Sequence, residues 1–504
     1  MRTQNIAMHP GSKRRAVGHR GALVASLLAC CFGWLGTAHG AEHWFEEAKT
    51  TATPLQLYTF LYALPKGGDL HNHLTGAVRS EWYWDAALAQ EARGYTYYTR
   101  VRIENCAPYG NNEFGAGKEL LLFKNIQGSN FDKLDICAQS EFKRLQDLDE
   151  HEKHGWLESM RLDQRYEGRN EFFEAIWDRI DGLLHNPYLI CDILLRNMQA
   201  FGEEGVVYLE TQQGVQGAKK PDGSPYSTDE VAAIYRQFLA SPQAKATGVE
   251  VRLQNSLIRF APDAEQRLRD LYAITDRYRD LYVGVNMVGR EDNDKGYPLR
   301  FLPVLRELRR KYPDINLSIH AGEVDEPNFH VRDTLLLGAQ RIGHGVNLIT
   351  DPETMVLMRN GPYLIEINLI SNLLLEYVSD YSQHPFPEYL RVGIPVALST
   401  DDRGMWDSNM SDEFYVAVKE FNLSWEEIVK VSRNSLQYSF VDQPTKQRLL
   451  AAYDKRIAAF ETQFQKKGWA ALADAKPVSY GFLCRRYQIC LLPAKAQVPG
   501  GASR

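Results

Sequence analysis

Eight short runs of apolar and β-branched residues recur along the sequence, and each leads directly into a polar side chain. Runs of this length that end at a polar residue are typical of buried strands. They span residues 67–70, 206–209, 249–253, 281–285, 315–319, 341–343, 363–365 and 396–400. Amphipathic stretches with helical spacing lie between or after them, for example residues 263–280, 299–312 and 411–420.

Strands that alternate with helices eight times predict an α/β fold, a (β/α)8 or TIM barrel over residues 65–440. Two kinds of segment fall outside the repeating unit. Residues 75–204 separate the first two strands and predict a long insertion, mainly helical, that caps the barrel mouth. Within it, residues 105–130 read as a loop and residues 141–198 as several helices. Residues 41–64 predict a helical extension, and residues 441–504 a tail that is helical at first and irregular from 471 onward.

The composition is that of a globular protein: 44% of the 504 residues are hydrophobic and 24% are charged. These values exclude a disordered, collagen-like or coiled-coil chain. The net charge of −6 conceals an asymmetry, since residues 1–40 hold five basic side chains and no acidic ones. The remainder has 53 basic and 64 acidic side chains, a net charge of −11. Such an acidic body excludes a nucleic acid polymer as partner and favours a small ligand.

Residues 1–40 predict a cleaved signal peptide. A basic segment ends at Arg20, an apolar run covers residues 21–36, and Ala38-His39-Gly40 precedes Ala41 as a cleavage pattern. The apolar run, about 16 residues long, is shorter than the ~20 residues that cross a bilayer. We therefore expect an exported, periplasmic or extracellular chain with no membrane attachment after processing. A twin-arginine signal and a lipoprotein site remain minority alternatives.

Five cysteines remain after removal of the signal, and none forms the C-x-x-C pair of a thiolate metal site. Cys106 with Cys137 and Cys484 with Cys490 are candidate disulfides. Cys191 lies in an apolar run and is expected to be a buried thiol.

His71 and His73 are two residues apart at the end of the first predicted strand, so their rings point to the same side. This pair alone would be read as two structural histidines. However, His320 ends the fifth strand and Asp401 ends the eighth, and the carboxyl ends of barrel strands meet at one face. Three imidazoles and a carboxylate suit Zn²⁺ and leave a position for water. We expect one zinc ion per chain.

Further polar residues follow the same strand ends. A zinc ion lowers the pKa of water toward about 7 and so supplies a nucleophile at neutral pH. Glu323 lies three residues after the fifth-strand histidine, where its carboxyl group can face a substrate. His344, at the next strand end, is placed to orient or deprotonate the water, and Asp402 stands beside the aspartate ligand.

Four motifs carry a resemblance to a known family: PKGGDLHNHLTG at residues 65–76, HAGE at 320–323, RIGHG at 341–345 and STDD at 399–402. Over residues 60–440 the chain resembles the adenosine deaminase family of the metal-dependent hydrolase superfamily. The export signal, the long insertion and the PKGG entry are similar to its secreted branch, the adenosine deaminase-related growth factors.

The resemblance implies a role for each position. His71, His73, His320 and Asp401 would hold Zn²⁺, Glu323 would protonate purine N1, and His344 would position the attacking hydroxide. Asp402 would accept a hydrogen bond from N7, and the backbone N–H of Gly289 would bind N3. The implied reaction is the hydrolytic deamination of adenosine, and of 2′-deoxyadenosine, to inosine or its deoxy counterpart and ammonia.

The sequence departs from the family at the sugar end. Relatives carry an aspartate one or two residues after the second histidine of the first strand, where this chain has Leu74 and Thr75. The alternatives are therefore an aminohydrolase for another 6-substituted purine, such as an N6-methylated or 5′-modified nucleoside or a free base, or a catalytically inactive binding relative. A homodimer is one open option for its assembly.

Overall fold

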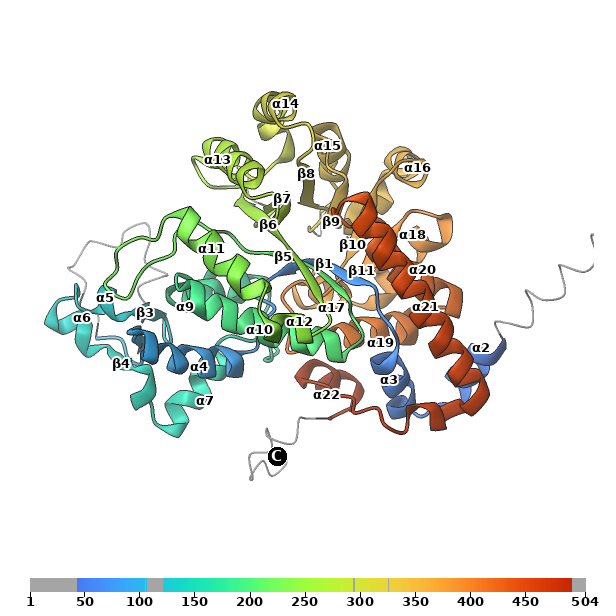
Figure 1. Ribbon diagram of the computed structural model, residues 1–504, viewed down its shortest axis with the longest axis horizontal. Helices are drawn as coiled ribbons and strands as arrows, with labels where there is room; N and C mark the ends of the chain where they lie inside the picture. The colour runs from blue at the N-terminus through green and yellow to red at the C-terminus, as the bar shows by residue number, and fades with distance from the viewer. Residues whose placement is uncertain (1–42, 105, 107–120, 293–294, 325, 492–504) are drawn as a thin grey trace, which may run out of the picture.

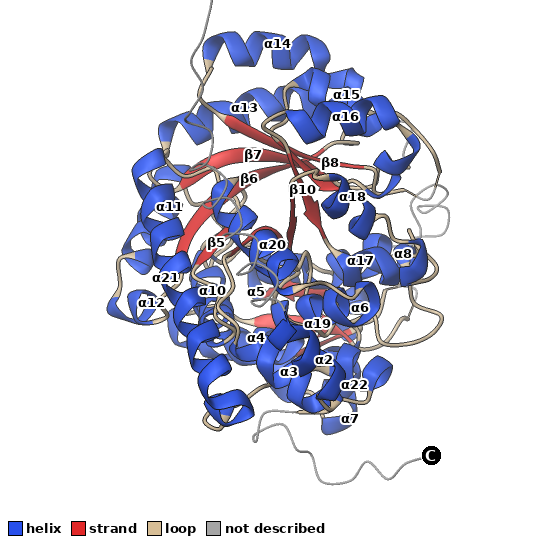
Figure 2. Cartoon of the chain, turned by 90° about the vertical axis from the view of Figure 1, so that its right-hand side faces the viewer, coloured by secondary structure: helices blue, strands red, loops and turns tan. Residues whose placement is uncertain are grey.

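Eight parallel strands form one sheet and follow one another in chain order, as the computed structural model shows (Figures 1 and 2). The structure describes residues 43–104, 106, 121–292, 295–324 and 326–491. The strands are β1 (Gly68–His73), β5 (Tyr208–Gln212), β6 (Glu250–Ile258), β7 (Tyr282–Val288), β8 (Asn316–Ala321), β9 (Arg341–His344), β10 (Leu364–Ile367) and β11 (Val396–Leu398). A parallel bridge between Asn72 and Asp401 joins the two ends of the sheet. The predicted barrel is confirmed.

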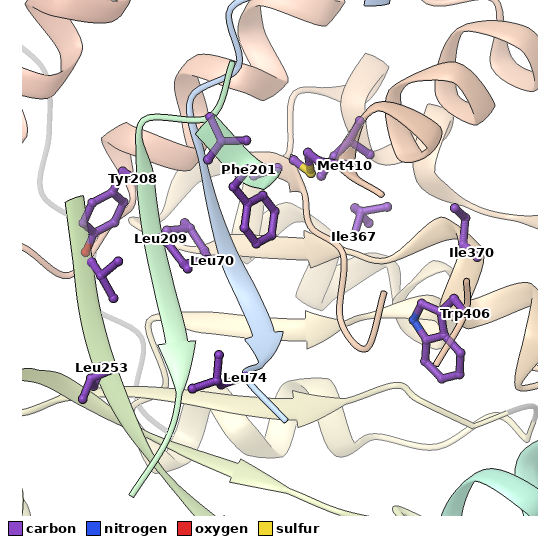
Figure 3. Close-up of a cluster of buried hydrophobic side chains, with 14 of the residues drawn as sticks. Leu70, Leu74, Phe201, Tyr208, Leu209, Leu253, Ile367, Ile370, Trp406 and Met410 are labelled. Carbon is purple, nitrogen blue, oxygen red and sulfur yellow. The ribbon is translucent and has the colours of Figure 1, made fainter. Parts of the chain in front are cut away.

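Helices surround the barrel and cover the outer face of its strands (Figure 2). They include α11 (Thr228–Leu239), α13 (Ala264–Arg277), α14 (Leu302–Lys311), α15 (His330–Leu337), α16 (Pro352–Asn360), α18 (Phe386–Val392), α19 (Met410–Phe421) and α20 (Trp425–Gln437). Outward-facing strand residues pack beneath such helices. Figure 3 shows Leu70 of β1 and Leu209 of β5 beside Phe201 of α10 (Pro187–Glu203), and all three side chains are buried.

The insertion after β1 contains a small sheet that the sequence pattern does not predict. Strands β2 (Tyr97–Arg100), β3 (Asn125–Gln127) and β4 (Phe142–Arg144) form an antiparallel sheet in the order β3-β2-β4. The helices around it are α4 (Ser80–Ala89), α5 (Gly128–Phe131), α6 (Ile136–Ser140), α7 (Glu150–Glu158), α8 (Arg169–Glu171) and α9 (Trp177–Leu184), and α10 follows. Strands of three or four residues are too short to show a period of two, so the sequence pattern does not reveal them.

Both candidate disulfides are present in the structure. Cys106 is bonded to Cys137 beside the small sheet, and Cys484 to Cys490 near the C-terminus, while Cys191 is a buried free thiol. The first bond closes a segment that includes residues 107–120, outside the described residues.

The terminal segments pack on the barrel through aromatic side chains. The N-terminal helices α2 (His43–Thr51) and α3 (Pro54–Ala63) bring Trp44 and Phe60 against Trp425 of α20 and Phe464 of α21 (Gln443–Lys467). Beyond α21 the tail is not wholly irregular, because α22 (Gly481–Tyr487) forms next to the second disulfide. The predicted signal, residues 1–40, lies outside the described residues. Among the described helices, none has the length and apolar character needed to cross a bilayer.

The interior of the barrel holds a chain of buried charges rather than apolar side chains alone. The guanidinium group of Arg341 lies 2.7 Å from a carboxylate oxygen of Glu210 and 2.7 Å from one of Glu366. Glu366 in turn lies 2.7 Å from Nδ1 of His71. Burial alone would raise the pKa of Glu366, but Arg341 and His71 hold it below its usual value. All four side chains are fully buried, so each charge depends on its partners.

We predict that Arg341→Met lowers the free energy of unfolding by about 3–5 kcal/mol, because it leaves two buried carboxylates without their cation. Urea denaturation of the wild-type chain and the variant measures the difference in the free energy of unfolding. Arg433→Met is the matched control: this exposed arginine pairs with Asp454 at the surface, and its loss should cost less than about 1 kcal/mol. A loss that small for Arg341→Met would contradict the prediction.

Candidate active site

Four groups from three strand ends converge at the mouth of the barrel. Nε2 of His71 and Nε2 of His73 lie 3.4 and 3.3 Å from Oδ1 of Asp401. Nε2 of His320 lies 3.3 Å from Nε2 of His73. The ligand atoms of all four residues lie within 4.8 Å of one another. The structure therefore brings together the four metal ligands predicted from the sequence.

The predicted ligands bind other protein groups through the atoms that point away from the cluster, and the atoms that face one another remain available to a cation. Nδ1 of His71 is bound by Glu366, and Nδ1 of His320 lies 3.1 Å from Oδ1 of Asn286. An acceptor at Nδ1 keeps the proton there, so Nε2 presents its lone pair. Ser371 donates from Oγ to the outer oxygen of Asp401 at 2.7 Å. Nε2 of His71 is buried and has no hydrogen-bond partner among the described residues. The donor set would supply a metal ion with four protein ligands, and water would be the fifth.

Local backbone geometry allows this crowding. Asp401 and His344 both have positive φ angles, 53° and 68°, which are uncommon for residues with a side chain. A Cβ atom at Gly343 would lie 2.5 Å from the ring of His71, and one at Gly76 would lie 1.6 Å from Oδ1 of Asp402. Glycine is therefore required at both positions if the two side chains are to keep their places.

Glu323 lies beside the predicted ligands in a buried position. Its Oε1 is 3.6 Å from Nε2 of His344, and one potential ligand atom of His320 lies within 4.8 Å of those of both residues. Burial, reinforced by the Asp401 carboxylate, raises the pKa of Glu323 to about 8. At neutral pH the group is therefore mostly protonated and able to give up a proton.

Asp402 is also buried, and its Oδ1 has no partner among the described residues. Burial and the adjacent Asp401 raise the pKa of Asp402 well above its usual value. A carboxyl group in this state donates a hydrogen bond. This alters the expected role, because purine N7 carries a lone pair and needs a donor.

Gly289 follows β7 with a φ of 96°, and its carbonyl accepts from Nε of Arg259 at 2.9 Å. Nη1 of the same arginine donates to the carbonyl of His320 at 2.6 Å. Glu291 completes the arrangement, since its carboxylate accepts from the N–H groups of Gly322 at 3.1 Å and Glu323 at 2.7 Å. Arg259 and Glu291 thus hold the two segments that carry Gly289 and Glu323. Neither residue could be identified from the sequence, where the only signal was a charged residue close behind a strand end.

The insertion reaches the site through aromatic side chains. A π-helical turn, Phe172–Ile176, precedes α9 and places the ring of Trp177 6.1 Å from that of His73. Phe172 packs against Trp177 and Trp406. The predicted cap therefore lies against His73, a predicted metal ligand.

A family model described as adenosine deaminase matches residues 156–456, more than half of the chain. The chain belongs to the adenosine deaminase family. Adenosine deaminase 2 from Homo sapiens is 24% identical over 438 residues, with 82% of each chain covered. This family membership confirms the resemblance seen in the motifs and makes the chain a hydrolytic deaminase of the metal-dependent amidohydrolase type.

Solved structures share the fold of this deaminase. An amidohydrolase from Burkholderia ambifaria with bound Zn has a TM-score of 0.58 at 19% identity, covering 81% of this chain and 94% of that one. The apo N6-methyl-AMP deaminase from Arabidopsis thaliana has a TM-score of 0.56 at 21% identity, covering 79% and 98%.

We predict one tightly bound metal ion per chain, lost in His320→Ala, because that change removes an imidazole ligand. Elemental analysis after dialysis measures the stoichiometry. His154→Ala is the matched control, since this histidine is exposed in the insertion and should leave the metal content unchanged. A full metal complement in His320→Ala would remove that residue from the ligand set, and wild-type activity that survives exhaustive chelation would refute the metal site.

Proposed function

We propose that this deaminase is a zinc enzyme that hydrolyses adenosine, and 2′-deoxyadenosine, to inosine or deoxyinosine and ammonia. The observation that carries the proposal is the buried carboxyl group of Glu323 beside the cluster of His71, His73, His320 and Asp401. The raised pKa of this group keeps a proton available at neutral pH. A proton donor next to a metal site is what attack on a purine ring at C6 requires.

The donor set supports zinc as the metal. Three imidazole nitrogens and one carboxylate oxygen match its preferred ligands, and a solved structure of the same fold contains Zn. When bound, the ion would lower the pKa of water and supply a nucleophile at neutral pH.

The residues of the chain would act on the purine ring from several sides. Glu323 gives its proton to N1, which makes C6 electrophilic toward water. One proton of the added water goes to the amino group, which leaves as ammonia, and the other returns to Glu323. Asp402 donates to N7, and the Gly289 N–H donates to N3. His344, 3.6 Å from Glu323, holds the attacking water. Because these groups are buried, their hydrogen bonds to the ring form in a medium of low dielectric constant and are strong.

The sugar end of the site offers no carboxylate at the positions where relatives have one. Leu74 is fully buried, and the backbone carbonyl of Thr75 accepts from the hydroxyl group of Tyr83 at 2.7 Å. Glu210 directly follows the predicted strand 206–209, but it is excluded as a replacement for the missing carboxylate because it lies inside the barrel against Arg341. The next inward-facing residue of β5 is Gln212, which lies opposite His73 in the register of β1 and β5. Its buried side-chain amide has no hydrogen-bond partner among the described residues.

We also propose that the chain is exported, as residues 1–40 imply, and that it acts on free nucleosides rather than on nucleic acid. The acidic body supports the second point.

We predict that Glu323→Gln keeps its metal and loses about 10²–10⁴-fold in kcat, because an amide cannot deliver the N1 proton. Absorbance-monitored deamination of adenosine measures the loss, and a wild-type panel with 2′-deoxyadenosine, AMP, adenine and N6-methyladenosine establishes the substrate. Glu326→Gln, three residues further along and exposed, is the matched control. Turnover within a factor of two of wild type would exclude Glu323 from this role, and preference for another panel member would replace adenosine as the substrate.

We predict that 5′-deoxyadenosine loses little in kcat/KM relative to adenosine, because Leu74 and Thr75 place no side-chain carboxylate at the 5′ hydroxyl. A site that binds a substrate hydroxyl through a buried polar group rejects the deoxy analogue by about 10⁴-fold. A penalty of about 10³-fold or more would therefore contradict the prediction. Gln212→Met would then test whether the Gln212 amide performs this task.

A further inference from the structure

The direction of one hydrogen bond near the site is fixed by the backbone. The N–H of Phe386 can only donate, and it donates to Nδ1 of His384 at 3.1 Å. His384 is buried, and burial lowers its pKa to about 3, so the ring is neutral. A neutral imidazole that accepts at Nδ1 carries its proton on Nε2.

That proton determines the next link. Nε2 of His384 lies 3.0 Å from the side chain of Asn372, and the atom that faces an N–H must be the oxygen. The amide of Asn372 is thereby oriented with Nδ2 toward His344, 2.9 Å from its Nδ1. Nδ2 of Asn368 lies on the same side at 3.3 Å. His344 is therefore faced at Nδ1 by N–H donors.

The two metal ligands with known outer contacts have the opposite arrangement. Nδ1 of His71 faces the carboxylate of Glu366, and Nδ1 of His320 faces the oxygen of Asn286. The Asn286 oxygen is itself assigned by a chain of amides: Asn286 donates to Gln254, which donates to Glu210, an acceptor. Acceptors at Nδ1 leave a lone pair on Nε2, whereas donors at Nδ1 leave a proton there.

We propose that Phe386, His384 and Asn372 form a directional relay that holds His344 as the Nε2–H tautomer. Nε2 of His344 is buried without a hydrogen-bond partner among the described residues, 3.6 Å from Oε1 of Glu323 and 3.9 Å from Oδ2 of Asp401. Its N–H points at the place where, under the proposed function, the attacking water sits. His344 donates to a lone pair of the water oxygen and takes no proton from it, since Nε2 is already protonated. His384 and Asn372 are positioning residues.

Nitrogen NMR of histidine labelled with ¹⁵N tests the tautomer directly and requires no substrate. The His344 signals are assigned by their loss in His344→Gln. We expect Nε2 to be protonated and Nδ1 to be bare in the wild-type chain, and the reverse pattern would overturn the proposal. Because this readout is independent of turnover, a failure of the relay is distinguishable from a chain that does not deaminate adenosine.

Kinetics of two Asn372 variants provide a second test. In Asn372→Asp a carboxylate faces Nδ1, so the proton moves there, and a wrong tautomer in a catalytic histidine costs about 10⁴-fold in serine proteases. In Asn372→Ala the bias is removed but not reversed. We therefore expect Asn372→Asp, with its metal retained and KM little changed, to lose more kcat than Asn372→Ala, and His384→Phe to lose less than either.

A role in packing alone predicts the opposite order, because alanine creates a cavity and aspartate does not. Asn372→Ala slower than Asn372→Asp would thus overturn the relay. Asn434→Asp is the matched control for an added carboxylate. Asn434 lies on α20, outside the barrel, and its partly buried amide donates to the carbonyl of Val396. Its replacement should leave kcat within twofold of wild type.

Discussion

The barrel interior depends on the buried ion pairs that the guanidinium group of Arg341 makes with Glu210 and Glu366. The guanidinium group neutralises both carboxylates, and Glu366 binds Nδ1 of His71, a predicted metal ligand. A charged group deep in the protein is tolerable only when paired. The orientation of the His71 ring is therefore determined inside the barrel, by its hydrogen bond to Glu366 and by the ion pair that Glu366 makes with Arg341.

The same principle extends around the site. Each inward-facing side chain with a known outer contact is oriented by a buried partner: Ser371 for Asp401, Asn286 for His320 and Asn372 for His344. Strained backbone at His344 and Asp401 persists because these contacts overdetermine it. A site built in this way is organised before substrate arrives, which reduces the reorganisation that catalysis requires.

Much of the fold and the ligand set could be predicted, because both follow from local patterns. An apolar run that ends in a polar residue predicts a strand. The parallel arrangement of the strands then brings their polar ends together. The partners could not be predicted: Glu291, Arg259 and His384 matter through tertiary contacts that no spacing encodes. Glu210 directly follows the apolar run 206–209, which predicts a position at the barrel mouth. The observed strand β5 continues to Gln212, so Glu210 lies inside the barrel instead. The small sheet could not be predicted because its strands are only three or four residues long.

The barrel is closed at the bridge between Asn72 and Asp401, so its seam passes through the predicted metal site. Ligands from the first and the last strand meet only there, and bringing such distant segments together costs loop-closure entropy that nearby contacts do not. An N-terminal fragment that stops before β11 has the histidines but not the carboxylate. The four groups therefore come together only when the barrel closes, and an ion held by them would tie the beginning of the barrel to its end.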